Sequence, residues 1–186
     1  MSLNVPNALT GLRLAVSPGL AVLALAGRAD LFLYLFLALE ATDWLDGKLA
    51  VLLDQRTELG SRLDSVADLV MYALLLGGLA VLEGDALLGE WAWIASVPLT
   101  YAASWIASWA KFGQMPAYHT YSAKASYFLV IVATAALLAG SLVWPVRVAA
   151  AAVAVGNLEA VAITAVLEEP RSDVPSLLTV IGEDRA

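Results

Sequence analysis

The sequence predicts an all-α integral membrane protein, a bundle of six transmembrane helices with a short amino-terminal interfacial helix. Hydrophobic residues make up 61% of the 186-residue chain, and the mean hydropathy is +0.79, which is too high for an ordinary soluble domain. Apolar runs of roughly 17 to 25 residues recur, each long enough to cross a hydrocarbon core about 30 Å thick. The short alternating strands of a membrane barrel do not occur in the pattern, which leaves helices as the spanning elements.

The expected spans follow one another at short intervals. A juxtamembrane segment at 1–10 comes first, the spans cover about 11–27, 31–53, 59–82, 90–110, 122–140 and 146–167, and a polar cytoplasmic tail follows at 168–186. Pro18 is tolerated within the first span. Trp91 and Trp109 lie near opposite ends of the fourth, where amphipathic rings prefer the membrane interface. Because no repeat or linker-like stretch divides the sequence, we expect one domain over 1–186.

The distribution of positive charge predicts the orientation. Six spans put both termini on one side, and a cytoplasmic placement puts most of the lysine and arginine residues inside, in agreement with the positive-inside rule. The inner set is Arg13, Lys48, Arg56, Arg62, Lys111, Lys124, Arg171 and Arg185, and the outer set is Arg28 and Arg147. We therefore expect a multi-pass protein of the cell (inner) membrane with cytoplasmic termini.

Composition argues against several classes of function. The net charge of -7 is unfavourable for a nucleic-acid-binding surface. The sequence contains no cysteine, so it has neither a disulfide framework nor thiol chemistry. The first residues lack the basic segment of a cleaved signal peptide, so we expect the first apolar run to remain as structure.

Four aspartates interrupt the second and third expected spans. Asp43 and Asp46 are three residues apart, and Asp64 and Asp68 are four apart, so each pair shares one helix face. At 1.5 Å per residue, each pair reaches up to about 15 Å from the cytoplasmic end of its span. The two pairs therefore face each other across a tight turn at 54–58. Carboxylates at such a depth are costly, and this marks a functional site by default.

Two interpretations of these carboxylates are open, shared protons or bound divalent metal, because like charges this close do not all stay ionised alone. Sites made of aspartate oxygens suit hard ions such as Mg²⁺ or Mn²⁺, and two such ions would clamp a diphosphate. Gly47 and Gly60 each cost about 1 kcal/mol relative to alanine in a helix, usually offset by close approach of another helix or a ligand. With Ala50, they would leave a hollow beside the aspartates.

The spacing of these residues resembles a known signature. Asp43-x2-Asp46-Gly47-x2-Ala50-x9-Gly60-x3-Asp64-x3-Asp68 is similar to the pattern D-x2-D-G-x2-A-R-x8-G-x3-D-x3-D of the CDP-alcohol phosphatidyltransferases. Every spacing agrees, and the departure is Val51, where the family has arginine. The resemblance extends to Pro6-Asn7-x-Leu9-Thr10-x2-Arg13 and to the six-helix plan, so it covers most of the chain.

The resemblance implies a reaction of phospholipid biosynthesis. Family members transfer a phosphatidyl group, or another phosphate-linked group, from a CDP-activated donor to the hydroxyl of an alcohol and release CMP. CDP-diacylglycerol would be the donor, and two divalent cations, Mg²⁺ or Mn²⁺, would be the cofactors. Carried over by position, the metal ligands are Asp43, Asp46, Asp64 and Asp68, and Asp68 also accepts the proton of the acceptor hydroxyl. Gly47, Ala50, Gly60 and Thr10 would line the cytidine nucleotide.

Val51 is the expected weak point of the site. An arginine at this position would pair with a donor phosphate or a neighbouring acid, and valine does neither. We therefore expect the metal ligands to keep their arrangement, and donor binding or turnover to be lowered.

Cations near the cytoplasmic mouth suggest an anionic acceptor pocket. Lys124 is the strongest candidate, because the polar stretch 118–124 leads into the fifth span, and Arg62 and His119 are the others. The alternative is that Lys124 and Arg62 are topogenic or headgroup-binding charges and that His119 is structural. By analogy with small bacterial-type members, glycerol 3-phosphate is the expected acceptor and an inositol phosphate the alternative. The resemblance also implies a homodimer.

Other polar residues in the spans have simpler explanations. Asn7, Thr10 and Arg13 recur at three-residue spacing, which makes one face of the first helix polar, and Asn7 fits a capping or interfacial role. Glu40, one turn before Asp43, and Glu159 fit buried hydrogen bonding between helices, and Glu40 also fits a supporting role for the ligands.

Two functions of other classes compete with the enzyme. An ion or proton transporter would distribute carboxylates along a path across the bilayer, whereas here four lie in one half and the remaining ones within spans are Glu40 and Glu159. A non-catalytic membrane scaffold would not explain the spacing of the aspartates.

Overall fold

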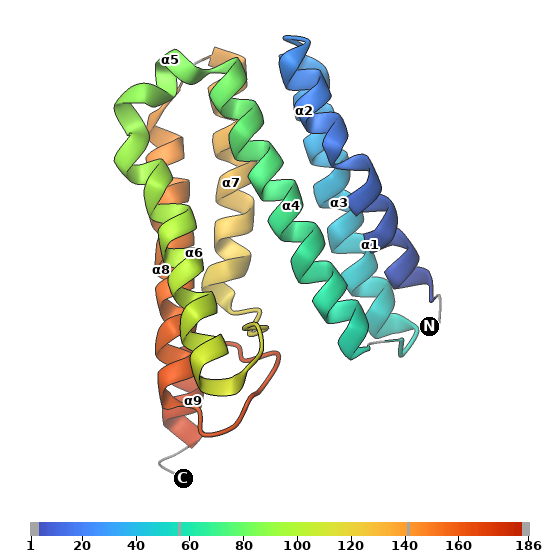
Figure 1. The fold of residues 1–186 in the computed structure, drawn as a ribbon, viewed down its shortest axis with the longest axis vertical. Coiled ribbons are helices and arrows are strands. Elements are labelled where there is room, and N and C mark those ends of the chain that lie inside the picture. Colours follow the sequence, from blue (N-terminus) through green and yellow to red (C-terminus); the bar gives the residue numbers. More distant parts are fainter. Residues whose placement is uncertain (1–3, 56, 141, 184–186) are drawn as a thin grey trace. The chain divides into compact units, whose positions relative to one another are not determined.

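The computed structural model describes residues 4–55, 57–140 and 142–183, and all regular structure within them is helical (Figure 1). The helices are α1 (Val5–Val16), α2 (Pro18–Leu25), α3 (Ala29–Leu52), α4 (Glu58–Leu82), α5 (Gly84–Leu87), the 3₁₀ turn η1 (Leu88–Glu90), α6 (Trp91–Phe112), α7 (Tyr121–Gly140), α8 (Trp144–Val166) and α9 (Leu177–Glu183). The all-α prediction is confirmed for the described residues.

Four helical stretches are long and apolar enough to cross a membrane, which supports a membrane protein. They are Val5–Leu25, Leu63–Leu82, Tyr121–Gly140 and Trp144–Val166. Helices α3 and α6 have comparable lengths of 24 and 22 residues, but α3 contains the acids of the signature and α6 is rich in tryptophan and serine. The expected count of six spans therefore stays a prediction.

Residues Met1–Gly84 form one compact unit. Helices α1 and α2 each pack against both α3 and α4, so they lie between the two helices that carry the signature. The side chain of Asn4 caps α1 by accepting a hydrogen bond from the backbone N–H of Asn7 at 2.9 Å. The first span is interrupted at Ser17, because Pro18 lacks the N–H that would continue the helix, and Pro18 begins α2 instead.

Large apolar side chains fill the interior of this unit between the aspartates and the ends of α3 and α4 that lie farther from the turn at 54–58. Phe32, Phe36, Met71 and Leu75 are all 2% exposed or less. Gly78 allows this packing, since a Cβ at that position would lie 2.3 Å from the ring of Phe32. The ring of Phe32 on α3 can therefore pack against the backbone of α4 only because Gly78 has no side chain.

The turn between α3 and α4 is tied to the amino terminus. Helix α3 ends at Leu52 and α4 begins at Glu58, each one residue from the predicted limits of 53 and 59. The hydroxyl of Thr57 caps α4 by accepting from the N–H of Gly60 at 3.0 Å. The Asn4 amide donates to the carbonyl of Gln55 at 2.9 Å. The start of α1 therefore holds the loop that joins the two signature helices.

Residues Asp85–Ala186 form a second compact unit, in which α8 packs against α6, α7 and α9. A bidentate ion pair connects η1 to α8: Arg147 donates from Nε and Nη2 to the two carboxylate oxygens of Glu90, at 2.7 and 2.6 Å. Glu159 accepts from Ser122 on α7 and from the N–H of Leu177, which agrees with the interhelical hydrogen bonding expected for it.

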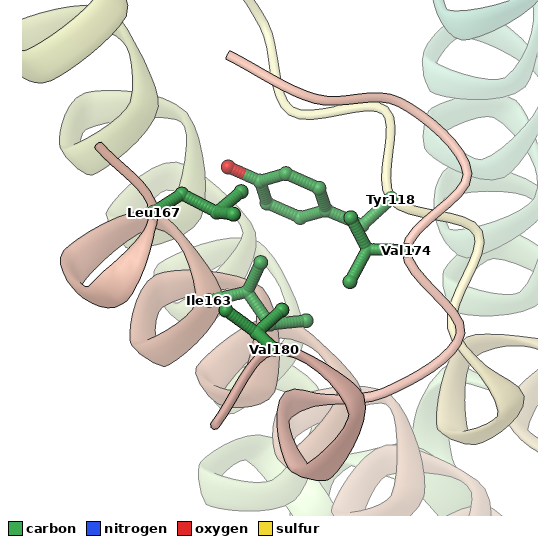
Figure 2. Packing of buried hydrophobic residues seen from close by; sticks show 5 residues of the cluster. All are labelled: Tyr118, Ile163, Leu167, Val174 and Val180. Carbon is green, nitrogen blue, oxygen red and sulfur yellow. The ribbon is translucent and has the colours of Figure 1, made fainter. Parts of the chain in front are cut away.

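The segment after α8 is more structured than the polar tail that the sequence predicts. Val174 and Val180 are buried against Ile163, Leu167 and Tyr118, and together they form an apolar cluster beside α9 (Figure 2). The charged residues on either side make this segment look polar as a whole, although Leu177, Leu178, Val180 and Ile181 give its centre an apolar character. Burial of these few apolar side chains folds the segment back on α8, and Leu177 also packs against the cluster.

Candidate active site

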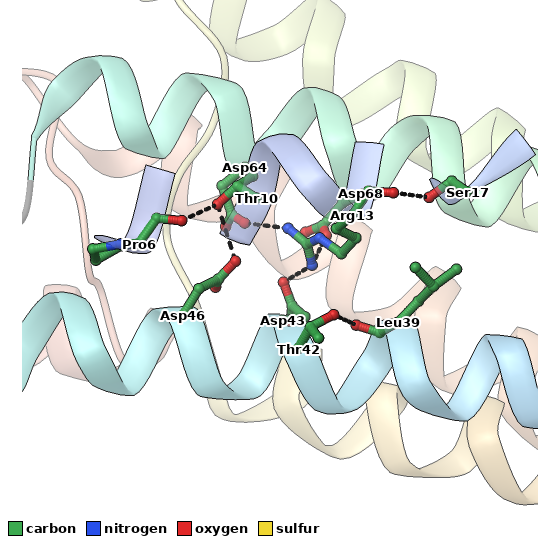
Figure 3. Close-up of polar contacts among 10 residues, drawn as sticks. All are labelled: Pro6, Thr10, Arg13, Ser17, Leu39, Thr42, Asp43, Asp46, Asp64 and Asp68. Atoms are coloured by element: carbon green, nitrogen blue, oxygen red, sulfur yellow. Dashed lines mark hydrogen bonds and ion pairs between the residues drawn. The ribbon is translucent and has the colours of Figure 1, made fainter. Parts of the chain in front are cut away.

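Three aspartates from two helices surround one arginine from a third helix, and a fourth aspartate lies nearby (Figure 3). Asp43 and Asp46 come from α3, Asp64 and Asp68 come from α4, and Arg13 comes from α1 between them. The two aspartate pairs thus face each other, as the sequence predicts, and α1 forms a further side of the site.

Arg13 is the centre of the cluster. Its side chain is 0% exposed, and its guanidinium donates from Nη1 to Oδ1 of Asp43 and from Nη2 to Oδ1 of Asp64. Nη1 also lies 3.0 Å from Oδ1 of Asp68. The three aspartate side chains are 26%, 30% and 38% exposed, in chain order. The arginine is therefore enclosed while the acids are open on one side.

Asp46 is held separately from the other three acids. It is 4% exposed, and the hydroxyl of Thr10 lies 2.9 Å from its Oδ2. The same hydroxyl lies 3.1 Å from the carbonyl of Pro6, so its single proton is shared between two acceptors. Thr10, expected to contact nucleotide, in this structure orients a predicted metal ligand, and its contact with nucleotide stays a prediction.

The donor set fits divalent metal. Asp43, Asp64 and Asp68 each offer an oxygen, and these oxygens lie within 4.8 Å of one another. Carboxylate oxygens are the ligands that Mg²⁺ and Mn²⁺ prefer. When all four aspartates are ionised, the one guanidinium leaves three negative charges uncompensated, so the cluster has capacity for further positive charge.

The two signature glycines differ in what surrounds them. A Cβ on Gly60 would lie 2.5 Å from Oδ1 of Asn7 and 2.9 Å from Oγ1 of Thr57. The absence of a side chain at Gly60 therefore lets Asn7 of α1 pack closely against α4. A Cβ on Gly47 would meet nothing within 4 Å, and Ala50, one turn on, is only partly buried. The space beside Gly47 is open, as a ligand-binding surface requires. That Gly47, Ala50 and Gly60 bind nucleotide stays a prediction.

Two of the three predicted acceptor residues, Lys124 and His119, belong to the second compact unit, whereas the aspartates belong to the first. Lys124 is exposed in the first turn of α7, with its ammonium 5.7 Å from the ring centroid of Tyr121. His119 is exposed in a left-handed conformation with φ of 53°. The side chain of Arg62 lies outside the described residues. Acceptor binding by these three residues stays a prediction.

Arg13 is the site residue that sequence reasoning missed. The charge pattern places it among the cytoplasmic residues that set topology, whereas the structure buries it among the acids. The signal was its three-residue spacing from Thr10, which puts both side chains on the α1 face that contacts α3 and α4. A charged side chain on the same helix face as a buried polar residue points into the protein and not toward a lipid headgroup.

Comparison with known proteins identifies the fold family. A family model described as CDP-alcohol phosphatidyltransferase matches residues 3–163, which is most of the chain and includes α1, α3 and α4. The chain belongs to the CDP-alcohol phosphatidyltransferase family. This confirms the resemblance found in the signature, and the protein is a transferase.

A curated relative supports the same family. The CDP-diacylglycerol–glycerol-3-phosphate 3-phosphatidyltransferase of Cereibacter sphaeroides is 38% identical over 95 residues, which are 49% of this chain and 42% of that protein. The match thus spans less than half the length of the relative. No solved structure matches the chain. CDP-alcohol phosphatidyltransferases use divalent metals, and the aspartate cluster is where this chain would bind them.

Proposed function

We propose that this phosphatidyltransferase moves a phosphatidyl group from CDP-diacylglycerol to glycerol 3-phosphate, releasing CMP, at the aspartates between α1, α3 and α4. The observation that carries the proposal is the convergence of Asp43, Asp64 and Asp68, whose oxygens lie within 4.8 Å of one another, in a chain of this family. The named relative uses glycerol 3-phosphate according to its name, which favours this acceptor over an inositol phosphate, the second candidate.

Each aspartate has a proposed task. Asp43, Asp46 and Asp64 hold two divalent cations, Mg²⁺ or Mn²⁺, which supply positive charge for the donor's diphosphate and for the departing CMP. Thr10 fixes the rotamer of Asp46 through its hydroxyl. Asp68 is the most exposed of the three acids around Arg13, at 38%, and is the proposed general base, in addition to being a metal ligand.

The reaction balances as a single displacement. The acceptor's hydroxyl oxygen attacks the phosphorus that carries the diacylglycerol, and its proton passes to a carboxylate oxygen of Asp68. The bond between that phosphorus and the bridging oxygen breaks, and CMP leaves with the electron pair. Because Thr10 on α1 already orients Asp46, this ligand needs no reorganisation during the step.

Other parts of the proposal concern the surroundings of the site. Gly47, Ala50 and Gly60 line the cytidine, and Lys124, Arg62 and His119 bind the phosphate of the acceptor. The open acids face the cytoplasmic side of the cell membrane, as the excess of inner lysine and arginine predicts. The enzyme works as a homodimer, as the family resemblance implies.

Release of CMP tests the proposal directly. Purified protein in detergent or lipid is mixed with CDP-diacylglycerol, Mg²⁺ or Mn²⁺, and either glycerol 3-phosphate, an inositol phosphate or no acceptor. We expect CMP to be released with glycerol 3-phosphate, and phosphatidylglycerophosphate to be detected by mass spectrometry. EDTA and the Asp68→Asn substitution should each abolish release. Activity that persists in either case would sink the mechanism, and a preference for another alcohol would change only the acceptor.

A further inference from the structure

The geometry points to a second state for Arg13. We infer that Arg13 competes with divalent metal for the aspartate carboxylates, moves away from them when metal binds, and then pairs with the donor's diphosphate. This inference rests on the proposed function in one respect, because it requires metal and a diphosphate donor at this site.

The first argument is competition for the same oxygens. The guanidinium contacts Oδ1 of Asp43 and Oδ1 of Asp64, and it lies 3.0 Å from Oδ1 of Asp68. These residues are the ones whose oxygens lie within 4.8 Å of one another and form the candidate metal-binding group. A metal at about 2.0–2.1 Å from oxygens of the same three carboxylates would lie close to the guanidinium, and the two positive charges would repel each other. Metal binding therefore favours withdrawal of Arg13 from these carboxylates.

The second argument is the incomplete hydrogen bonding of Arg13. Its Nε is buried and has no hydrogen-bond partner among the residues that the structure describes, although the side chain is 0% exposed. A buried donor without an acceptor is unfavourable, so the present position of the guanidinium leaves one N–H unsatisfied. A second position with a further acceptor would remove this cost.

The third argument concerns what receives the released guanidinium. An enclosed arginine does not remain without an anion, because an uncompensated buried charge is strongly destabilising. The diphosphate of the donor brings negative charge to this site together with metal, and the planar guanidinium matches phosphate oxygens in a bidentate way. Donor and metal should then bind cooperatively, each favouring the state that the other requires.

A purely structural arginine predicts the opposite sign. If Arg13 serves only to hold α1 against α3 and α4, its removal loosens the cluster and weakens metal binding. If it competes with metal, its removal strengthens metal binding in the absence of donor. The sign of the change in metal affinity therefore separates the two roles.

Titration with Mn²⁺, followed by electron paramagnetic resonance on the detergent-solubilised full chain, measures this sign. Without nucleotide, Arg13→Ala should bind Mn²⁺ about tenfold or more tightly than wild type, since a neighbouring positive charge is removed. Arg13→Lys keeps a charge with shorter reach and should lie between the two. Arg147→Ala, which removes an arginine paired with Glu90, should leave the affinity unchanged.

A second measurement follows the released guanidinium. At saturating Mn²⁺, wild type should bind CDP more tightly than CMP, which lacks the second phosphate, and Arg13→Ala should narrow this preference. Mn²⁺ affinity that is equal or weaker in Arg13→Ala overturns the inference. If Arg13→Ala does not fold, the Mn²⁺ affinity of Arg13→Lys decides in the same way. If the wild type binds Mn²⁺ and releases CMP but the Arg13 variants bind Mn²⁺ no more tightly, this inference alone is wrong. If the wild type does not bind Mn²⁺, the proposed function is wrong too.

Discussion

Two arginine–carboxylate clusters of this protein have the same chemistry and opposite arrangements. Arg147 and Glu90 form a one-to-one pair with two hydrogen bonds of 2.7 and 2.6 Å. Arg13 serves three carboxylates at once, and a fourth, that of Asp46, is held nearby by Thr10. The first cluster is neutral and its geometry is complete. The second has a deficit of positive charge, which is the property expected of a cation-binding site.

Exposure is also reversed between the two clusters. In the pair, the carboxylate is enclosed, with a side chain 6% exposed, and the Arg147 side chain is 54% exposed. At the site, Arg13 is enclosed and the three acids that it contacts are open. Open acids around an enclosed cation present unused oxygen lone pairs to an incoming metal ion, whereas an enclosed acid with both oxygens bonded presents none. A binding site therefore differs from a structural ion pair in the number of carboxylates per arginine and in the exposure of these carboxylates.

The largest effect is expected from neutralising one open acid. Asp64→Asn should lower the rate of CMP release by on the order of 100- to 1,000-fold or more, because one charged metal ligand is lost. Glu90→Gln is the matched control: it also neutralises an acid paired with arginine, and it should lower Tm while leaving the rate nearly unchanged. Equal losses of activity in both variants would remove the distinction between the clusters.

A smaller effect should separate packing from ligand contact at the two glycines. Gly60→Ala forces the side-chain ends of Asn7 and Thr57 to move and should destabilise the fold by about 1 kcal/mol, the lower end of the cost of overpacking. Combining it with Asn7→Ala should restore part of the loss, as a double-mutant cycle of Tm values shows. Gly47→Ala should raise Tm slightly, because alanine is favoured over glycine within a helix, and should raise KM for the donor. Gly77→Ala, where a Cβ also meets nothing within 4 Å, is the control that should raise Tm in the same way and leave KM unchanged.

The smallest effect, and a gain, is expected at Val51. This residue is 55% exposed near the end of α3, so an arginine can be placed there without burying its charge. Val51→Arg should increase turnover or donor affinity by roughly a fewfold, the contribution of a partly exposed ion pair. Val51→Lys, with a charge but no planar fork, should gain less. Initial rates over a range of CDP-diacylglycerol concentrations measure both, and rates equal to wild type would show that the position is unimportant.

The sequence predicts the parts of this structure that depend on local pattern. Helix limits follow apolar runs and turn residues, so α4 is expected at 59–82 and is found at Glu58–Leu82. The grouping of Asp43, Asp64 and Asp68 follows from helical spacing and a tight turn. Family membership then confirms the class of enzyme that the signature indicates.

The parts that sequence reasoning misses depend on tertiary contacts. Arg13 has the same local pattern whether it faces headgroups or acids, and only the packing of α1 between α3 and α4 decides this. The folding of α9 onto α8 depends on contacts of Val174 and Val180 with Ile163 and Leu167 on the preceding segment, and the short apolar stretch that contains the two valines does not show by itself what it packs against. Interactions between residues distant in the sequence leave little trace in composition or spacing.

Direct binding of Mn²⁺ tests whether the acids around Arg13 form a metal centre while the acid paired with Arg147 does not. Electron paramagnetic resonance titrations would compare wild type, Asp64→Asn and Glu90→Gln without nucleotide. We expect two Mn²⁺ ions bound per chain in wild type and in Glu90→Gln, and a large loss of binding in Asp64→Asn. Binding in Asp64→Asn equal to that of wild type would contradict a metal centre at these acids.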